Sequence, residues 1–584
     1  MASPRPAMHD AVPADRRDAR PATWKNFGEG AGRRRPGPRG RALVVPAVAL
    51  GVAGICQWCG WTATATAVAG AVALAAGFRA GMAVLGVILS GSNGVVAVAR
   101  AVVAEVLGTR LPTVLMAVVF VGLPALPLAL DPTERLEYRL QFFLEWSLSA
   151  ASVILALVAI VMACGSVCGD IDTQRIHMTL VKPLRRWEYL LGKWVGIVLV
   201  ELLLVLLVGG GVAACTATLA RLPAVDAADR RAVDEQVLTA RSAARPEHPQ
   251  REDFERAVAA EIDRIRDEDP AAFARDPAGA RKRIRARNVL QWHTVTADVV
   301  ESYLFTGLDR ERIRSSVVQL RLKPFANNSR ISRAEVRFAL WLNERAYPFR
   351  NGVHEEYTVR TGSVHTIEVP TSAISDDGSL RVTIANRNLI MPSEDVPTSI
   401  SFSPGTGLEL LYRTGGFAGN FVRGLVVMWA KLAMIAAAAL AAAAWLGFPT
   451  AVLASLMVLV TAVASGFFAD ALDIYTGLDD ARPTLTSMLR LRGGMLLERL
   501  VRGEFWEAAK TVSSFLTEWF LVAVPSFADY DSIGAVSAGR VVPAADVAWC
   551  CGELGLVYPA VLLVLGWILL ESRDLVNTSG SAGG

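Results

Sequence analysis

The sequence predicts an α-helical polytopic membrane protein that carries an inserted α+β domain outside the membrane. Three observations predict this fold class. The 584 residues are 53% hydrophobic with a mean hydropathy of +0.37, which is too apolar for an ordinary soluble enzyme. Several apolar runs reach the roughly 20 residues that a spanning helix needs. A long polar region, 219–420, separates two groups of these runs.

The apolar runs predict six spanning helices and an N-terminal hairpin. The six runs are 111–130, 141–166, 194–218, 421–446, 449–468 and 546–570. A further apolar block at 42–90 is long enough for a membrane hairpin, which adds two crossings and leaves their parity unchanged. The segment 93–109 holds Arg100 and Glu105 among apolar residues at helical spacing, which predicts a helix in the membrane interface.

The basic segments predict the orientation in a cytoplasmic (inner) membrane. The tail 1–41 is rich in Arg, Pro and Gly, cannot bury a core, and is expected to be disordered in the cytoplasm. An even number of crossings then places 219–420 outside and the flexible tail 574–584 inside. The short run 512–528 contains a glutamate and a proline and is interpreted as interfacial or re-entrant; a full crossing there would reverse the side of every later segment.

The inserted region 219–420 divides by composition. Residues 224–290 are charged, alanine-rich and helical in pattern, whereas 313–413 alternates apolar and polar residues between turn signals. This alternation predicts a β-sandwich of jelly-roll type. The expected strands are Val317–Leu322, Ala334–Leu342, Val364–Val369, Leu380–Ala385, Thr398–Phe402 and Leu408–Tyr412.

Composition and motifs argue against several function classes. The net charge of +4 is too small to indicate a nucleic-acid partner. No phosphate-binding G-x-x-x-x-G-K-[ST] motif and no G-x-S-x-G nucleophile turn occurs, and the six histidines lack paired metal-ligand spacing. We therefore expect no cofactor, no metal and no enzymatic activity in this chain.

The charged segment 169–193, between two spanning runs, is the strongest functional signal. Its five basic residues favour the cytoplasmic side. One interpretation is that these residues only set the membrane topology and form an aromatic belt, with Trp187, Tyr189 and Trp194 at headgroup depth. The order of the residues favours a second interpretation, a site where a partner protein binds.

That order resembles the cytoplasmic loop of type-2 (ABC-2 type) ABC transporter permeases, which often reads E-x-x-x-x-T-x-x-x-L-x-x-P-x-R-R-x-x-x-L-x-G-K. The matching residues are Pro183, Arg185, Arg186, Leu190, Gly192 and Lys193. The acidic position is Asp170 or Asp172, where the family usually has Glu. The resemblance extends over an interfacial helix and three core spans in 91–218 and three more spans in 421–573, and the insert resembles the outer β domain of enlarged family members.

The resemblance implies a membrane-spanning permease subunit that moves an unknown substrate with ATP hydrolysed by a separate ABC ATPase subunit. It also implies a homodimer, or a heterodimer with a similar permease, in contact with membrane lipid. The loop would dock on the ATPase as a coupling helix. Its expected coupling residues are Asp170, Asp172, Lys182, Pro183, Arg185, Arg186, Trp187, Glu188, Gly192 and Lys193. The alternative is a membrane-tethered binding or mechanotransmission protein whose sandwich recruits a ligand or partner outside.

Two charged residues fall inside spanning runs, Glu201 and Lys431. Burying either charge alone in a bilayer costs a few kcal/mol or more. At about 1.5 Å of rise per residue their depths differ by about 12 Å, a gap that two long side chains could just close. An intramembrane pair, a polar element of a translocation path and snorkelling side chains all remain open.

Overall fold

A computed structural model describes residues 62–476 and 526–572, apart from short gaps. The gaps are 92, 107–109, 174–184, 249, 271–272, 274–276, 298, 309–312, 314–316, 328–334, 351–352, 389–397 and 405–406. The tail 1–41, the first half of the hairpin at 42–90, most of the run 512–528 and the tail 574–584 therefore lie outside the described residues.

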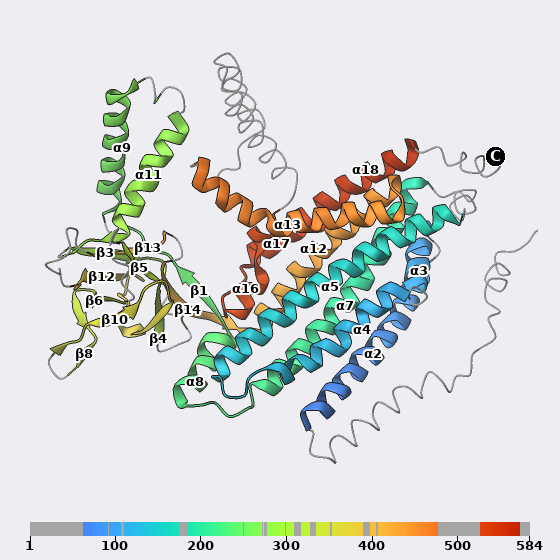
Figure 1. Cartoon of the computed structure of the whole chain (residues 1–584), viewed down its shortest axis with the longest axis horizontal. Helices are drawn as coiled ribbons and strands as arrows, with labels where there is room; N and C mark the ends of the chain where they lie inside the picture. The colour runs from blue at the N-terminus through green and yellow to red at the C-terminus, as the bar shows by residue number, and fades with distance from the viewer. Residues whose placement is uncertain are drawn as a thin grey trace, which may run out of the picture.

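The membrane-spanning part is a bundle of long helices (Figure 1). They are α2 (Thr62–Ile88), α3 (Gly94–Val106), α4 (Arg110–Ala125), α5 (Leu136–Asp172), α7 (Arg186–Leu219), α12 (Phe417–Trp445), α13 (Phe448–Thr476), α17 (Ala544–Gly552) and α18 (Tyr558–Ser572). The 3₁₀ turn η2 (Leu126–Ala129) extends α4, and the π-helical turn η6 (Glu553–Val557) joins α17 to α18.

Seven helices in the described part of the chain are long and apolar enough to cross a membrane, and they include all six of the predicted spans. They are Thr64–Ile88, Leu111–Ala129, Leu136–Asp172, Arg186–Leu219, Phe417–Trp445, Phe448–Ser465 and Ala544–Ser572. The chain is thus a polytopic helical membrane protein. The seventh helix occupies the second half of the predicted hairpin.

Small residues let the central helices approach closely. Residues 436–444 of α12 are all alanine except Leu440, and most of these alanines are buried in a helix whose neighbours include α5, α7 and α18. In α7, a Cβ added at Gly192 or Gly196 would lie within 3 Å of backbone atoms of α3. Without a hydrophobic force between helices in lipid, such close van der Waals contact is what holds a bundle together.

The inserted domain is built from antiparallel sheets that share one apolar core. One sheet has the order β1-β14-β4-β11 and the other β10-β6-β12-β3, with β7 paired to β6; β2-β13-β5 and β8-β9 form smaller sheets. The strands are β1 (Thr239–Ala244), β2 (Thr294–Val295), β3 (Val300–Phe305), β4 (Val317–Leu322), β5 (Pro324–Asn327), β6 (Glu335–Leu342), β7 (Arg345–Tyr347), β8 (Phe349–Arg350), β9 (Val353–His354), β10 (Tyr357–Arg360), β11 (His365–Pro370), β12 (Leu380–Asn386), β13 (Ser399–Phe402) and β14 (Leu408–Gly416).

All six predicted strands are present, as β4, β6, β11, β12, β13 and β14. Inward positions such as Leu320 and Ile384 are fully buried, which is the alternation that identified them in the sequence. The segment predicted to be helical contains α8 (Ala227–Ala232), the π-helical turn η3 (Val233–Val237), α9 (Arg251–Glu268) and α11 (Pro277–Trp292).

One part of the helical expectation was wrong. Residues 239–244 form β1 instead of a helix, because their backbone pairs with the edge of β14. Strand pairing thus overrides the local helix propensity of this segment. The helices α9 and α11 lie side by side and project from the sheets (Figure 1).

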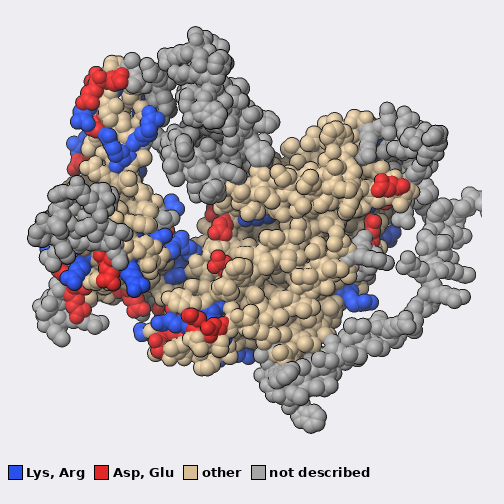
Figure 2. Space-filling model, in the orientation of Figure 1, with Lys and Arg blue, Asp and Glu red and all other residues tan. Residues whose placement is uncertain are grey.

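Charged side chains are distributed unevenly between the helical bundle and the inserted domain. The visible face of the helical bundle carries few charged side chains, whereas Lys, Arg, Asp and Glu gather on the inserted domain (Figure 2). This distribution is expected when one part faces lipid and the other faces water.

Candidate functional site: the two ends of the α5 and α7 pair

The candidate coupling segment connects α5 to α7, which pack side by side (Figure 1). The structure describes residues up to Thr173 and again from Arg185, so Lys182 and Pro183 lie outside the described residues. We call the end of the bundle next to this connection the loop end. The opposite end, where α7 leaves for the inserted domain, is the domain end.

Three of the predicted coupling residues are exposed at the loop end. Asp172 lies in the last turn of α5, and Arg185 and Trp187 lie at the start of α7. Trp187 is 40% exposed although it is a large aromatic residue. These three side chains are free of the helix packing and can reach a partner.

Arg186 and Glu188 instead stabilise the start of α7. The Arg186 guanidinium donates hydrogen bonds to the carbonyl oxygens of Leu570 and Glu571, at 2.9 and 3.2 Å, at the end of α18. The Glu188 carboxylate accepts the backbone N–H of Arg185 at 2.9 Å. A cation near the last carbonyls and an acidic cap at a first turn both satisfy helix-terminal groups that lack intrahelical partners.

Asp170 and Lys193 form an ion pair between α5 and α7. The Lys193 ammonium, 4% exposed, lies 2.8 Å from an Asp170 carboxylate oxygen and 3.7 Å from Glu105 of α3, and donates to the carbonyl oxygen of Ser166 at 3.1 Å. The Tyr189 hydroxyl donates to the same Asp170 oxygen at 2.8 Å. These groups tie α3, α5 and α7 together beneath the exposed residues. We call Glu105, Asp170 and Lys193 the loop-end charge cluster.

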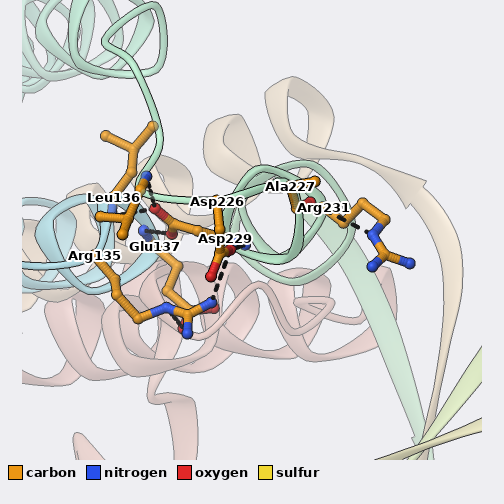
Figure 3. Close-up of polar contacts among 8 residues, drawn as sticks. Arg135, Leu136, Glu137, Asp226, Ala227, Asp229 and Arg231 are labelled. Atoms are coloured by element: carbon orange, nitrogen blue, oxygen red, sulfur yellow. Dashed lines mark hydrogen bonds and ion pairs between the residues drawn. The ribbon is translucent and has the colours of Figure 1, made fainter.

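The domain end is organised around a different carboxylate, Asp229 of α8. Its side chain, which is fully buried, accepts the backbone N–H groups of Leu136 and Glu137 at 3.0 Å each and of Val225 at 2.9 Å (Figure 3). Asp229 thereby caps the start of α5 from a segment more than 90 residues later in the chain. Arg135 adds ion pairs to Asp226 at 3.6 Å and to Glu137 at 3.3 Å.

Two opposing effects act on the pKa of Asp229. Burial raises it, but the three backbone N–H groups, those of Glu137, Leu136 and Val225, favour the charged form and together hold the pKa below its usual value. The carboxylate is therefore a charged acceptor near a helix N-terminus, where the helix dipole also favours a negative charge.

A second polar cluster joins the inserted domain to the bundle. The Arg540 guanidinium lies 2.6 Å from the Glu409 carboxylate of β14, and Arg321 of β4 lies 3.4 Å from it. The backbone of Arg241 in β1 accepts the N–H of Val541 at 2.8 Å and donates to the carbonyl oxygen of Gly539 at 2.8 Å. Residues 539–541 thus add a short bridge to the edge of the sheet. Gly539 has φ of +63°, and a Cβ there would collide with the carbonyl oxygen of Gln236.

The same bridge is fastened to the first turn of α12. The Asn420 side chain donates to the carbonyl oxygen of Arg540 at 2.6 Å and accepts the N–H of Val542 at 2.7 Å. Since β14 also runs directly into α12, the domain is held to this helix by covalent and polar contacts together.

The Arg241 side chain beside this bridge stays charged at neutral pH. Burial, and after it the neighbouring Arg321, lower the pKa of its guanidinium to about 10.

Glu201 and Lys431 do not form the intramembrane pair that was one of the three open interpretations. The Lys431 ammonium donates to the carbonyl oxygens of Phe527 and Tyr530, at 3.0 and 2.9 Å. Glu201 is fully buried in α7, and neither of its carboxylate oxygens has a hydrogen-bond partner among the residues that the structure describes. Backbone carbonyl oxygens instead satisfy the ammonium of Lys431.

Sequence reasoning missed three residues of these ends: Glu105, Tyr189 and Asp229. Glu105 carried a signal, because it is an acidic residue that interrupts the apolar face of the predicted interfacial helix. Tyr189 was interpreted only as an interfacial aromatic residue. Asp229 carried none, because it is one of many acidic residues in a charged stretch and its partners are backbone groups far away in the sequence.

A protein-family model matches the chain in this region. Residues 133–230 match the family model described as ABC-2 family transporter protein. The matched range begins just before α5 and ends in α8, so it contains α5, the candidate coupling segment, α7 and the Asp229 cap. Neither a curated protein nor a solved structure matches the chain.

Proposed function

We propose that this chain, an ABC-2 type permease by its family domain, works as the membrane-spanning subunit of an ABC transporter powered by a separate ATPase subunit. The observation that carries the proposal is the overlap of the family match with the helix pair that flanks the segment 169–193. ATP-driven closure of two ATPase subunits would push on this segment and shift the bundle between inward-facing and outward-facing populations.

The exposed residues at the loop end define the proposed docking surface. It consists of Asp172, Arg185 and Trp187. Lys182 and Pro183, which lie outside the described residues, stay predicted coupling residues. Asp170, Arg186, Glu188, Gly192 and Lys193 act one layer deeper, by holding the ends of α5, α7 and α18 in place. A force applied to the docking surface would therefore reach the helices through the loop-end charge cluster.

This arrangement supports an orientation with the loop end in the cytoplasm and the inserted domain outside. By the positive-inside rule, the basic tail 1–41 and the basic residues of 169–193 are both expected in the cytoplasm. One six-helix core offers half of a pathway, so two permease chains, identical or similar, would assemble with two ATPase subunits.

The docking proposal is tested by co-purification with a candidate ATPase subunit expressed together with this chain. The double substitution Arg185→Glu and Trp187→Ala should lower recovery of the ATPase at least about tenfold, because central aromatic and arginine contacts contribute most of the affinity of an interface. Arg221→Glu, an exposed arginine just beyond the far end of α7, is the matched control and should change nothing. Equal recovery with both variants would contradict the docking surface.

A second candidate function is favoured by the domain-end junction. The Glu409–Arg540 ion pair and the Asn420 bridge bind the sheet to α12, which is the contact that a mechanotransmission protein would need. In that case the sandwich would bind a partner outside and α12 would carry the signal inward. ATPase stimulation without movement of any substrate would favour this function over transport.

A further inference from the structure

Two arginines face each other on the sheet that joins the inserted domain to the bundle. Arg241 of β1 lies directly opposite Arg413 of β14 in the strand register. Leu410 and Leu320 belong to the apolar core, so the alternate positions, which include both arginines, lie on the other face of the sheet. Directly opposite residues have about 4.5–5.5 Å between their Cβ atoms, and like charges at this spacing destabilise a strand pair. A negative charge at the pair would remove this repulsion.

Neither arginine forms an ion pair within the part of the chain that the structure describes. The Arg241 guanidinium donates to the side-chain oxygen of Gln319 and, at 2.7 Å, to the carbonyl oxygen of Ala538, and both of these acceptors are neutral. The Arg413 side chain has no hydrogen-bond partner in the same part of the chain. The two positive charges are thus left without a counterion among the described residues.

The carboxylates on this face of β1, β14, β4 and β11 do not balance its arginines. Glu409 is shared by Arg540, at 2.6 Å, and Arg321, at 3.4 Å. Glu368 lies on β11, at the edge of the sheet, and is exposed. The described residues of this face and of the bridge 539–541 contain four arginines and two glutamates, namely Arg241, Arg321, Arg413 and Arg540 against Glu368 and Glu409. Four positive and two negative charges leave an excess of two positive charges.

Two N–H groups of the pair are buried without an acceptor. The Nε atoms of Arg241 and Arg413 have no hydrogen-bond partner among the described residues, and Arg241 as a whole is only 8% exposed. Folded proteins satisfy the large majority of their buried polar groups, so each exception requires an explanation. An oxyanion would accept these N–H groups and would also neutralise the two guanidinium charges.

The surroundings of the pair leave room for a ligand. The neighbouring cross-strand pair is Gly415 and Ala240, and a Cβ added at Gly415 would meet only the Cβ of Ala240, at 3.5 Å. Arg413 is half-buried, so solvent reaches part of its side chain. Figure 2 shows basic side chains on the side of the inserted domain that lies next to the bundle. Since β14 runs directly into the spanning helix α12, the pair lies near the domain end of that helix.

We propose that Arg241 and Arg413 bind a phosphate monoester group. A guanidinium presents a planar fork of N–H donors that matches the oxygens of phosphate. A phosphate monoester carries about −1.5 to −2 charges at neutral pH, which matches the excess of two positive charges on this face. The group belongs either to a soluble phosphorylated molecule or to a lipid whose headgroup ends in phosphate, such as phosphatidic acid. The site does not depend on the proposed docking of an ATPase.

The bound group would strengthen the junction between the inserted domain and the bundle. It would join β1 to β14 through the two arginines. Arg241 also donates to the carbonyl oxygen of Ala538, which lies next to the bridge 539–541. Occupancy would therefore stabilise the contact of the sheet with the segment that leads into the last spanning helix.

The first test uses the purified full-length chain in phosphatidylcholine nanodiscs, with inorganic phosphate as the probe. Thermal unfolding is compared in phosphate and in chloride of equal ionic strength. A ligand that binds only the folded protein raises the unfolding temperature, and we expect a rise of at least about 2 °C in phosphate and none in chloride. An equal rise in both salts would indicate screening of charges and would overturn the site.

A second set of nanodiscs distinguishes the two sources of the group. These nanodiscs contain phosphatidic acid, and the buffer contains no free phosphate. A higher unfolding temperature in these nanodiscs, with no further rise when inorganic phosphate is added, identifies a lipid headgroup as the ligand. A rise with inorganic phosphate that is the same in both kinds of nanodisc identifies a soluble ligand. No rise with either probe overturns the proposal.

Substitution of Arg413 separates binding from folding, because this side chain has no partner among the described residues. Without phosphate, Arg413→Gln should unfold at the wild-type temperature or above it, since repulsion from Arg241 is removed. Its affinity for the probe should fall about tenfold. Arg413→Lys keeps the charge without the fork and should bind about two- to threefold more weakly than the wild type.

Arg360→Gln, at an exposed arginine of the edge strand β10, is the matched control and should respond to phosphate as the wild type does. A wild-type response in Arg413→Gln would overturn the site. An unfolding temperature of Arg413→Gln below that of the wild type without phosphate would show that Arg413 stabilises the protein by itself, and would also overturn it. Recovery of the ATPase subunit is not part of this readout, so failure of this site and failure of the docking surface can be distinguished.

Discussion

The two ends of the α5 and α7 pair are held together by different chemistry. At the loop end, side chains bind side chains: Lys193 lies between Asp170 and Glu105. At the domain end, the Asp229 carboxylate binds three backbone N–H groups. A side-chain ion pair can exchange partners when helices slide, whereas a backbone cap is lost only if the helix start unwinds. We therefore expect α5 and α7 to pivot at the domain end and to move at the loop end.

The largest expected effect comes from Lys193→Met, which breaks the loop-end charge cluster. Removing one partner of a buried ion pair leaves an uncompensated charge, at a cost of about 3–5 kcal/mol in the free energy of unfolding. Denaturation in detergent micelles measures this change. The double variant Lys193→Met with Asp170→Asn should recover at least half of the loss, because it removes both charges. A single variant within about 1 kcal/mol of the wild type would show that the cluster does not hold the helices together.

Glu409→Gln tests the junction at the domain end. The substitution keeps the shape but removes the charge that Arg540 and Arg321 share, and a hydrogen bond to a charged group contributes about 1.5–3 kcal/mol. We expect a loss of stability in this range. We also expect calorimetry to show separate unfolding transitions for the domain and the bundle. Glu368→Gln, on an exposed position of β11, is the matched control. A single unchanged transition would mean that the covalent link alone couples the two parts.

Asp229→Asn tests the cap at the domain end through the pH dependence of the free energy of unfolding. Loss of a helix cap costs about 0.5–2 kcal/mol at neutral pH. Because the folded pKa of Asp229 is below its unfolded value, its contribution is fully present above the unfolded pKa of about 3.9 and is lost as pH falls through the folded pKa. The difference in unfolding free energy between wild type and variant should therefore shrink below about pH 4. A difference that stays constant between pH 7 and pH 3 would contradict the charged cap.

Glu201→Gln should have the smallest effect. The buried carboxylate has no partner among the described residues, so its replacement by an uncharged side chain of the same shape removes no contact. We expect a change below about 0.5 kcal/mol in the free energy of unfolding. A loss of more than 1 kcal/mol would reveal a partner that Glu201 acquires in another conformation or from another subunit.

The contrast between Lys193 and Glu201 shows how far sequence reasoning reached at the site. Both residues are charged residues of α7, and the sequence alone identified Glu201 as a charge inside a spanning run and Lys193 as a coupling residue just before that run. It could not tell that Lys193 lies against Asp170 and Glu105, whereas Glu201 faces no counterion in the described structure. The partners come from α3 and α5, and their positions depend on how the helices rotate against one another.

The roles of the coupling residues were predictable only as a group. The sequence order identified the segment 169–193 and its resemblance to a coupling loop. It did not separate the exposed Asp172, Arg185 and Trp187 from Arg186, which binds the end of α18. That separation requires knowing that α18, almost 400 residues later, ends beside the start of α7.

The sequence by itself determined the class of the protein, its spanning helices and six strands of the inserted domain. These features follow from local patterns, because the length of an apolar run and the alternation of side chains are properties of neighbouring residues. Tertiary structure decided the strand at 239–244, the cap from Asp229 and the partners of Lys193 and Lys431. Each of these depends on which distant segments meet, since hydrogen bonds, ion pairs and cavities form between surfaces that no local pattern encodes.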